Sequence, residues 1–477
     1  MMPGITASQL AAASNAMLIG EDVEVGGVSI DSRSVQQGDV FVAIKGERVD
    51  GHDFLEAAQN AGASAAVVEQ QQSSDITQIV VADSARALAA IAGLNRGLFK
   101  GTIIAITGSA GKTSCKNMVA SLLASRYNVC ATSGNLNNEL GVPLTLSRLT
   151  ANHDVGVIEM GAAKPGDISY LCDIARPDIS LLTNVNEAHL GGFGSIELTA
   201  KTKGEIFASL EQSGVAVLNA DDHFADYWRK TIASAQRDIQ VIDFSLQHSS
   251  AAVYVRNIQV SLQGTEFDVV LTISGQPVEF RARLPLLGEH NVANAAAAIA
   301  VAAVLQVDNG AMQAALEKVQ PAKGRLQLRQ ANNSLTLIDD SYNANPQAVV
   351  AAAKVLASIA GVKDCPSVMV LGDMGELGEQ AGEKHIATGR AVAEQGIDRL
   401  FACGEHASDY VRGFEQYASA KQQAGGAREF SCKQELVDEL LSDACANAAV
   451  LVKGSRFAAM DEVVEQLVNE PVWGGIH

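Results

Sequence analysis

The sequence predicts an α/β protein of three domains: a small α/β domain, a central doubly wound parallel sheet with a phosphate loop, and a C-terminal Rossmann-like domain. Its 477 residues are too many for a single hydrophobic core. Apolar runs rich in Val and Ile alternate with helical patterns, as in parallel sheets covered on both faces. A glycine-rich turn joins one such run to a helix. The expected domains are residues 1–84, 85–318 and 319–477.

The first domain is expected to be a small α/β module, because polar turns separate its short strand patterns. Residues 25–33 form a strand pattern that ends in a polar turn, and residues 39–44 form another. A helix at 54–61 precedes two more strands at 63–68 and 79–81.

The central domain begins with a helix at 84–99 that leads into the run 102–107, a continuous β-branched segment typical of a strand buried on both faces. Residues 253–284 alternate between apolar and polar side chains, which predicts an antiparallel extension. An alanine-rich helix from Asn291 closes the domain near residue 318. Further buried strands of the doubly wound sheet are expected at 155–160, 179–184 and 215–219.

The C-terminal domain repeats the alternation of strand and helix, which predicts a second Rossmann-like layer. Its strands are expected at 335–339, 367–371, 399–402 and 449–452.

The composition limits the classes of function. Hydrophobic residues make up 47% and charged residues 19% of the chain, which indicates a globular protein rather than a disordered one. The formal net charge of −19 argues against binding to nucleic acid or anionic lipid, so an anionic substrate needs a local basic pocket. The seven scattered cysteines include no CxxC pair, as expected in a reducing compartment.

No segment for export or membrane insertion is expected. The N-terminus has neither the basic region nor the apolar region of a signal peptide. The longest apolar stretch, 292–305, is shorter than the roughly 18 residues that span a bilayer. We therefore expect a cytoplasmic protein that binds no nucleic acid and does not insert into a membrane.

The turn after residues 102–107 predicts a loop that binds the phosphates of ATP. Glycines allow backbone N–H groups to face phosphate oxygens, and the following helix directs its positive end at them. Lys112 is expected to reach the β- and γ-phosphates, and the Thr113 hydroxyl to bind Mg²⁺. A full P-loop has Gly where Ile106 stands, so this loop is a shortened form; an ordinary strand–turn–helix is the alternative. The expected ATP-binding residues are Thr107, Gly108, Ser109, Ala110, Gly111, Lys112, Thr113 and Ser114.

Two further residues are candidates for the metal site. Glu159 lies at the end of the next buried strand, where a carboxylate meets the Mg²⁺ of the loop. His189 follows the strand at 179–184 and is expected at the same sheet edge. A local hydrogen bond is the alternative for Glu159, and a structural role is the alternative for His189.

Two lysines on a helix capped by Ser195 are expected to differ in their surroundings. Lys201 has Glu197 four residues before it and Glu205 four residues after it, which indicates a solvated, ion-paired face. Lys203 lies on the apolar face. Burial lowers the pKa of a lysine, and the neutral amine reacts with CO₂ to give a carbamate, an anionic metal ligand. The alternative is that Lys203 extends toward solvent or pairs with phosphate.

Signatures spread over essentially the whole chain resemble those of the Mur ligases of peptidoglycan synthesis. Each signature is weak by itself, but their combination in this order is specific. In the first two domains they are Asp31-Ser32-Arg33, 134–143, 188–194, 203–207 and 288–294. In the third domain they are Lys323-Gly324-Arg325, 339–346, 371–374 and Lys453-Gly454-Ser455-Arg456.

The resemblance implies an ATP-dependent amide ligase whose first domain binds the uridine nucleotide of a sugar substrate. The second domain would bind ATP, and the third would close the site and bind the incoming dipeptide. The carboxylate of UDP-MurNAc-tripeptide would form an acyl phosphate with ATP, and the amine of D-Ala-D-Ala would attack it. Two Mg²⁺ sites are implied, one at Thr113 and Glu159, the other at Glu159, His189 and a carbamylated Lys203.

The resemblance also implies roles for individual residues, with Lys112, Glu159, His189 and Lys203 catalytic. Asn291 and Asn294 would lie near adenine, and Arg325 and Asp340 near ribose and phosphate. Ser32, Arg33, Asn137, Asn138, Tyr342, Asn343 and Asn345 would contact substrates. Several have simpler alternatives: a helix cap for Asn291, a turn for Asp340, Ser32 and Arg33, and a solvated linker for Arg325.

The lack of one sequence motif narrows the expected activity. Family members that add diaminopimelate carry an Asp-Asn-Pro-Arg motif, which this chain lacks, whereas 342–345 is similar to the members that add D-Ala-D-Ala. The resemblance thus implies the final cytoplasmic step of precursor synthesis, and we expect a monomer. The alternatives are another amino-acid ligase, such as a folylpolyglutamate-type enzyme, or a nucleotide-gated binding module that hydrolyses ATP slowly.

Overall fold

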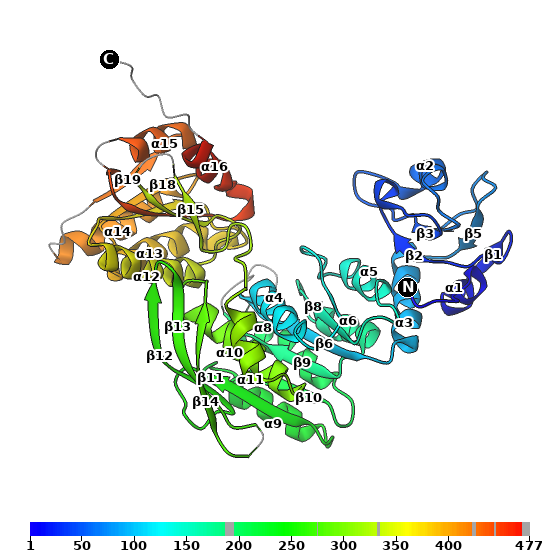
Figure 1. The fold of residues 1–477 in the computed structure, drawn as a ribbon. Helices are drawn as coiled ribbons and strands as arrows, with labels where there is room; N and C mark the ends of the chain where they lie inside the picture. Colours follow the sequence, from blue (N-terminus) through cyan, green and yellow to red (C-terminus); the bar gives the residue numbers. More distant parts are fainter. Residues whose placement is uncertain (187–194, 274, 332–333, 422–425, 443–444, 470–477) are drawn as a thin grey trace.

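The computed structural model describes residues 1–477 except 187–194, 274, 332–333, 422–425, 443–444 and 470–477. Within this part of the chain, three separate sheets form. Figure 1 shows the N-terminal and C-terminal domains on opposite sides of the central domain. The predicted three-domain α/β class is confirmed, while the boundaries after residues 84 and 318 stay predictions.

The N-terminal domain has a sheet of order β1-β5-β4-β3-β2 in its described residues, parallel except for β1. Strand β1 was not predicted, because its three residues are too short to show a period. The strands are β1 (Met17–Ile19), β2 (Gly27–Ser29), β3 (Asp39–Val42), β4 (Ala65–Val68) and β5 (Thr77–Val80); the helices are α1 (Ala7–Ala13), η1 (Ser32–Ser34), η2 (Gly51–Phe54) and α2 (Leu55–Asn60).

The central sheet has the order β14-β13-β12-β11-β10-β9-β6-β8-β7 in the described chain. It is parallel from β7 to β12, and β13 and β14 add the predicted antiparallel extension. Its strands are β6 (Thr102–Thr107), β7 (Val129–Ala131), β8 (Val155–Glu159), β9 (Ile179–Leu182), β10 (Val215–Asn219), β11 (Gln240–Ser245), β12 (Val253–Ser261), β13 (Gly264–Leu271) and β14 (Val278–Leu284).

Helices cover both faces of this sheet. They are α3 (Ser84–Leu98), α4 (Lys112–Leu123), α5 (Gly141–Ser147), α6 (Asp167–Ala175), α8 (Ile196–Ala208), α9 (Ala225–Ser234), α10 (Glu289–Val304) and α11 (Asn309–Leu316). The alanine-rich helix α10 begins two residues before the predicted start, because Gly288 adopts φ +91° and caps it.

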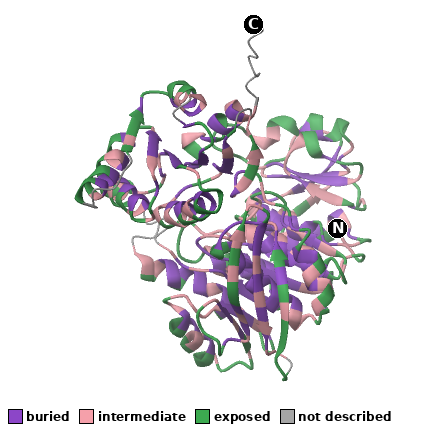
Figure 2. Ribbon diagram, turned by 60° about the vertical axis from the view of Figure 1, so that its left-hand side comes forward, coloured by how far each residue is buried: buried purple, intermediate pink, exposed green. Residues whose placement is uncertain are grey.

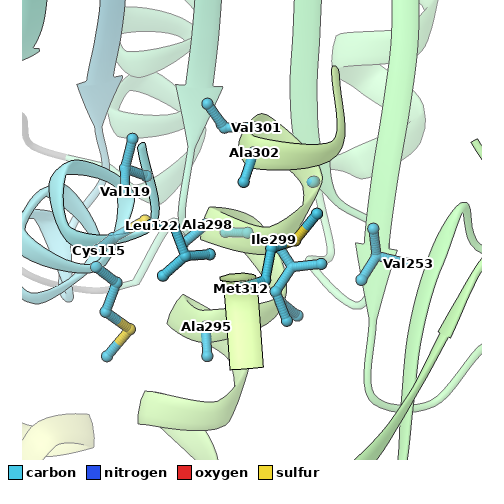
Figure 3. Packing of buried hydrophobic residues seen from close by; sticks show 14 of the residues in the cluster. Cys115, Val119, Leu122, Val253, Ala295, Ala298, Ile299, Val301, Ala302 and Met312 are labelled. Carbon is cyan, nitrogen blue, oxygen red and sulfur yellow. The ribbon is translucent and has the colours of Figure 1, made fainter. Parts of the chain in front are cut away.

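Helices α4 and α10 pack together in the central core. Figure 3 shows Cys115 and Leu122 of α4 beside Ala298 and Ile299 of α10, and all four side chains are fully buried. The small alanine side chains allow close packing of helix against helix. This contact brings the first turns of α4 and α10 to the same region of the molecule.

The C-terminal sheet has the order β15-β16-β20-β17-β18-β19 in the described chain and is parallel except for β15. Its strands are β15 (Gln327–Gln330), β16 (Thr336–Asp340), β17 (Ser367–Gly372), β18 (Arg399–Cys403), β19 (Gly426–Phe430) and β20 (Ala449–Lys453). Its helices are α12 (Pro346–Lys363), η3 (Gly378–Gln380), α13 (Ala381–Glu394), α14 (Ala407–Lys421), α15 (Lys433–Leu441), η5 (Arg456–Ala458) and α16 (Asp461–Asn469).

Helix α12 is long and apolar enough to cross a bilayer, the one such helix found among the described residues. Its apolar face, which includes Val349, Leu356 and Ile359, is buried in the core of the C-terminal domain. Figure 2 shows how buried residues concentrate in the sheets and on the helix faces that cover them. Packing on a sheet accounts for the composition of α12.

Candidate active site

The phosphate loop lies between β6 and α4 and is fixed by the end of β9. The N–H of Ser109 donates to the carbonyl oxygen of Asn184 over 2.9 Å, and the N–H of Ala110 donates to the side-chain Oδ1 of Asn184 over 3.0 Å. Strand β6 is flanked by β8 and β9, so the residues that follow all three strands meet at one sheet edge.

The two glycines of the loop are required by its geometry. Gly108 has φ +155°, and a Cβ there would lie 1.9 Å from the hydroxyl oxygen of Thr183. Gly111 has φ +79°, and its Cβ would lie 2.5 Å from Oδ1 of Asn294. A side chain at either position would displace the loop from its neighbours.

Lys112 folds back over the loop, and its Nζ donates to the carbonyl oxygen of Gly108 over 2.8 Å. Burial lowers the pKa of Lys112, while the nearby carboxylate of Glu159 opposes that shift. Thr107 differs from the other loop residues, since it is fully buried and its hydroxyl donates to the carbonyl oxygen of Met160 over 2.8 Å. Its side chain therefore joins β6 to the end of β8.

Glu159 is the last residue of β8 and lies beneath the loop, where its carboxylate accepts hydrogen bonds from two polar side chains. Its Oε1 accepts from the Thr113 hydroxyl over 3.2 Å and from the amide of Asn137 over 2.8 Å. Its Oε2 is buried and accepts no hydrogen bond from the part of the chain that the structure describes. A buried carboxylate oxygen without a donor fits a bound cation, and hydroxyl and carboxylate oxygens suit Mg²⁺.

His189, the other side chain predicted for this site, lies outside the described residues. No cluster of three or more His, Cys, Asp or Glu side chains that could hold a metal occurs in the described ranges. The predicted metal residues are Thr113, Glu159, His189 and Lys203, and Glu159 is the only one of them that is both described and of a type that such a cluster requires.

The predicted difference between the two lysines of α8 is confirmed. Lys203 is 1% exposed, whereas Lys201 lies on the exposed face. Burial, with a smaller contribution from the charge of Lys112, lowers the pKa of Lys203 to about 7. A large fraction of Lys203 is therefore neutral near neutral pH, which is the form that reacts with CO₂.

The predicted pairing of Lys201 with Glu205 is wrong. The Glu205 carboxylate accepts instead from the backbone N–H of Gly166 over 2.9 Å and of Ser169 over 3.0 Å, at the start of α6. The first N–H groups of a helix have no partner inside the helix, so they attract a nearby carboxylate.

The C-terminal domain reaches the loop through Arg325. Its Nη2 lies 3.5 Å from the hydroxyl oxygen of Thr113. The guanidinium lies 4.4 Å from the centre of the Tyr342 ring, which orients it toward the central domain. Arg325 is therefore a contact between the domains and not a solvated linker residue.

Asp340, at the end of β16, forms an ion pair with Lys453 at the end of β20. Lys453 Nζ lies 2.5 Å from Asp340 Oδ2 and also donates to the carbonyl oxygen of Asn343 over 2.9 Å. The N–H of Leu326 donates to Asp340 Oδ1 over 3.2 Å. Burial raises the pKa of Asp340, and the ammonium of Lys453 opposes this shift.

The two domains enclose a cavity of about 660 Å³ between them. It contains the loop, the Glu159 site and the residues around Arg325, so it brings together most of the predicted site. The predicted residues that line it are Ser109, Ala110, Gly111, Lys112, Thr113, Ser114, Asn137, Asn138, Glu159, Lys203, Asn291, Asn294, Arg325, Asp340, Tyr342, Asn343 and Asn345. Thr107 and Gly108 lie behind this surface.

Several of the lining asparagines also make local contacts. Asn345 Oδ1 accepts from the N–H of Ala348 and caps α12, and Asn138 Oδ1 accepts from the N–H of Gly141. Asn291 donates to the carbonyl oxygen of Leu287 over 2.9 Å, while Gly288 is the cap of α10. The alternative of a helix cap for Asn291 is therefore wrong.

Ser32 and Arg33 belong to the N-terminal domain and do not line the described cavity. They form the short helix η1, and Arg33 Nη2 lies 2.7 Å from Asp31 Oδ2. Hydrogen bonds from the Arg33 side chain and N–H lower the pKa of Asp31 to about 2. The turn that was the alternative for Ser32 and Arg33 is therefore present. The Arg33 guanidinium at this turn is exposed to solvent.

The sequence assigned no role to three residues of this region, although Lys453 belongs to one of the family signatures. Asn184 fixes the loop, and Lys453 neutralises Asp340. Lys116, one turn after Lys112 on α4, is 5% exposed and donates to the carbonyl oxygen of Thr132 over 2.7 Å. These residues could have been found in the sequence as polar side chains at the end of a buried strand or on the buried face of a helix.

Comparison with known proteins now defines the class. Residues 24–95 match the Mur ligase family catalytic domain, 106–302 the Mur ligase middle domain, and 324–456 the Mur ligase glutamate ligase domain. The chain belongs to the Mur ligase family.

Within the family, the chain is similar over almost its full length to ligases that are named for the addition of D-alanyl-D-alanine. The chain is 38% identical over 468 residues to the UDP-N-acetylmuramoyl-tripeptide–D-alanyl-D-alanine ligase of Escherichia coli (strain K12), covering 98% of this chain and 99% of that protein. It resembles a crystal structure of MurF from Acinetobacter baumannii with a TM-score of 0.87, 34% identity and coverage of 98% and 99%. MurF from Thermotoga maritima in complex with ADP gives a TM-score of 0.78, 28% identity and coverage of 92% and 96%.

Proposed function

We propose that this protein joins D-Ala-D-Ala to UDP-MurNAc-tripeptide in an ATP-dependent reaction, the final cytoplasmic step of peptidoglycan precursor synthesis. The observation that carries the proposal is the cavity in which Lys112 and Glu159 of the central domain face Arg325 and Asp340 of the C-terminal domain. Relatives that are named for this activity, matched over almost their full length, support the same substrates. ATP is the nucleotide of the family, and a MurF neighbour holds ADP.

The first chemical step is the transfer of the γ-phosphoryl group to the tripeptide carboxylate, with ADP as the leaving group. Carboxylate and triphosphate repel each other, so the site needs cations where they meet. Lys112, at the N-terminus of α4, and Arg325, near Thr113, supply positive charge from two sides. Backbone N–H groups of the loop and the α4 dipole add to this field.

The second step is attack of the dipeptide amine on the acyl carbon of the acyl phosphate. The C–N bond forms through a tetrahedral intermediate, the C–O bond to phosphate breaks, and the amine nitrogen loses a proton. Water would hydrolyse the acyl phosphate, so the cavity must exclude it. Closure of the C-terminal domain on the central domain serves this purpose.

Two magnesium ions form part of the proposal. Thr113 and Glu159 would hold one, and Glu159, His189 and carbamylated Lys203 the other. The buried, unsatisfied Oε2 of Glu159 and the burial of Lys203 support this assignment. Bound Mg²⁺ supplies charge neutralisation at the phosphates.

The remaining assignments are also proposals. Asn291 and Asn294 lie near the adenine of ATP, Arg325 and Asp340 lie near its ribose and phosphate, and Ser32 and Arg33 bind the uridine nucleotide. Asn137, Asn138, Tyr342, Asn343 and Asn345 surround the peptide substrates. We further propose a cytoplasmic monomer that neither binds nucleic acid nor inserts into a membrane, with domains 1–84, 85–318 and 319–477.

Release of phosphate from ATP, measured with each substrate omitted in turn, tests the function. We expect sustained release only when UDP-MurNAc-tripeptide and D-Ala-D-Ala are both present, with one amide formed per phosphate. Release that ignores the dipeptide would favour the nucleotide-gated module. Amide formation with folate and glutamate in place of these substrates would favour the folylpolyglutamate-type alternative.

A further inference from the structure

Arg456 lies just beyond the cavity, on the same sheet edge as the residues that line it. Lys453 lines the cavity at the end of β20, and Arg456 follows it three residues later in η5. The N–H of Ser455 donates to the carbonyl oxygen of Asp373 over 2.9 Å, which fixes the turn between them.

The Tyr342 ring connects Arg456 with Arg325. The guanidinium carbon of Arg325 lies 4.4 Å from the ring centre and that of Arg456 lies 5.6 Å from it. The two guanidinium groups are therefore within about 10 Å of each other. They differ in position, since Arg325 reaches the phosphate loop and Arg456 faces solvent.

The other cations around the cavity have partners within the protein, whereas Arg456 can bind an anionic ligand. Lys453 is paired with Asp340, and Arg325 is close to Thr113. No carboxylate of the described residues pairs with Arg456, which contacts the Tyr342 ring. Such a guanidinium, held by an aromatic ring, can form two parallel hydrogen bonds to a carboxylate.

The dipeptide presents a carboxylate at a matching distance. Its amine must reach the acyl carbon beside the phosphate loop, and its other end carries a negative charge. Two extended residues span roughly 7 Å, which lies within the limit of about 10 Å that Tyr342 sets on the separation of the two guanidinium groups. A dipeptide whose amine lies near Arg325 thus places its carboxylate toward Arg456.

We propose that Arg456 binds the terminal carboxylate of the incoming dipeptide and selects dipeptides with a free C-terminus. This inference rests on the proposed function. It makes Arg456 a specificity residue of the second half-reaction, without a role in formation of the acyl phosphate.

The test compares D-Ala-D-Ala with its neutral C-terminal amide as acceptors. We expect the wild-type enzyme to prefer the acid by about 10- to 100-fold in kcat/KM, the range of one charge-assisted contact. R456A should lower this ratio to near one through loss of activity on the acid, and R456K should restore part of it.

Arg428→Ala is the matched control. Its guanidinium also lies over an aromatic ring, that of Phe430 at 4.7 Å, but it pairs with Glu439 away from the cavity. R428A should keep the wild-type ratio. Acyl phosphate formed without dipeptide, trapped by borohydride reduction to the alcohol, should be equal in R456A and wild type, which separates a lost contact from a damaged fold.

The outcomes are distinct. An unchanged acid-to-amide ratio in R456A would overturn the role of Arg456, and a reduced yield of trapped acyl phosphate would also overturn it. If the wild-type enzyme forms no amide with D-Ala-D-Ala, the proposed function itself is wrong.

Discussion

The guanidinium of Arg325 and the hydroxyl of Thr113 lie 3.5 Å apart although 212 residues separate them in the chain. One belongs to the C-terminal domain and the other to the first turn of α4. Through this contact the C-terminal domain adds a positive charge to the phosphate loop and Glu159, which both belong to the central domain.

Replacement of Arg325 by Ala should lower kcat by roughly 10²- to 10³-fold, because a charge directed at the reacting phosphate is lost. R325K should recover only part of the activity, since an ammonium does not stack on Tyr342 as a guanidinium does. Steady-state kinetics measure both. Lys323→Ala is the control, because Lys323 is exposed and pairs with Glu465; equal losses at both positions would contradict the role of Arg325.

Lys203→Ala should lower activity on the order of 10²-fold or more, through loss of the anion that a carbamate supplies. Formate or acetate should restore part of the activity of K203A by taking the place of the carbamate. Lys201→Ala should be nearly silent because its side chain lies on the exposed face. If both variants lose activity equally, or if no small acid rescues K203A, the carbamate hypothesis fails.

Asn137→Ala should lower kcat by about 10-fold, the effect of one hydrogen bond to a buried charge. Its amide orients Oε1 of Glu159, so the Mg²⁺ concentration needed for half-maximal activity should rise as well. A titration of activity with Mg²⁺ measures both effects. Asn152→Ala, in an exposed loop, serves as the comparison, and an unchanged Mg²⁺ requirement in N137A would count against the assignment.

The free energy of unfolding should decrease when the pH is lowered below 6.5, because His385 is fully buried in the C-terminal domain. Its Nε2 accepts from the N–H of Met374 over 3.0 Å, and its Nδ1 lies 2.6 Å from the carbonyl oxygen of Ala381. Protonation of Nε2 would break the first hydrogen bond. Burial lowers the pKa of His385, with a smaller contribution from the stacked His406.

Because burial lowers the pKa of His385, folding opposes its protonation. As the pH falls through 6.5, His385 binds a proton in the unfolded chain but stays neutral in the folded chain. The free energy of unfolding therefore decreases. H385Q cannot titrate, and its Tm should therefore change less between about pH 7.5 and 5.5 than that of the wild type. His248→Gln, at an exposed site, should keep the wild-type slope. An equal slope in H385Q would exclude His385 as the group responsible.

Much of the fold was predictable from local patterns. Strands β6 and β10 have the bounds that their apolar runs predicted, and Lys203 is buried where its helical face predicted. Edge strands such as β1, β7 and β15 were not predicted, because short or polar segments pair only when a neighbouring strand is present.

The sequence by itself determined the phosphate loop, its strand and its helix, because these are consecutive in the chain and depend on glycine geometry and short-range periodicity. Tertiary structure decided what the loop faces. Thr113 and Glu159 are 46 residues apart, and Arg325 is farther still, so their meeting depends on strand order and domain packing. Local periodicity carries no information about either, which is why Asn184 and the Asp340–Lys453 pair emerged only from the fold.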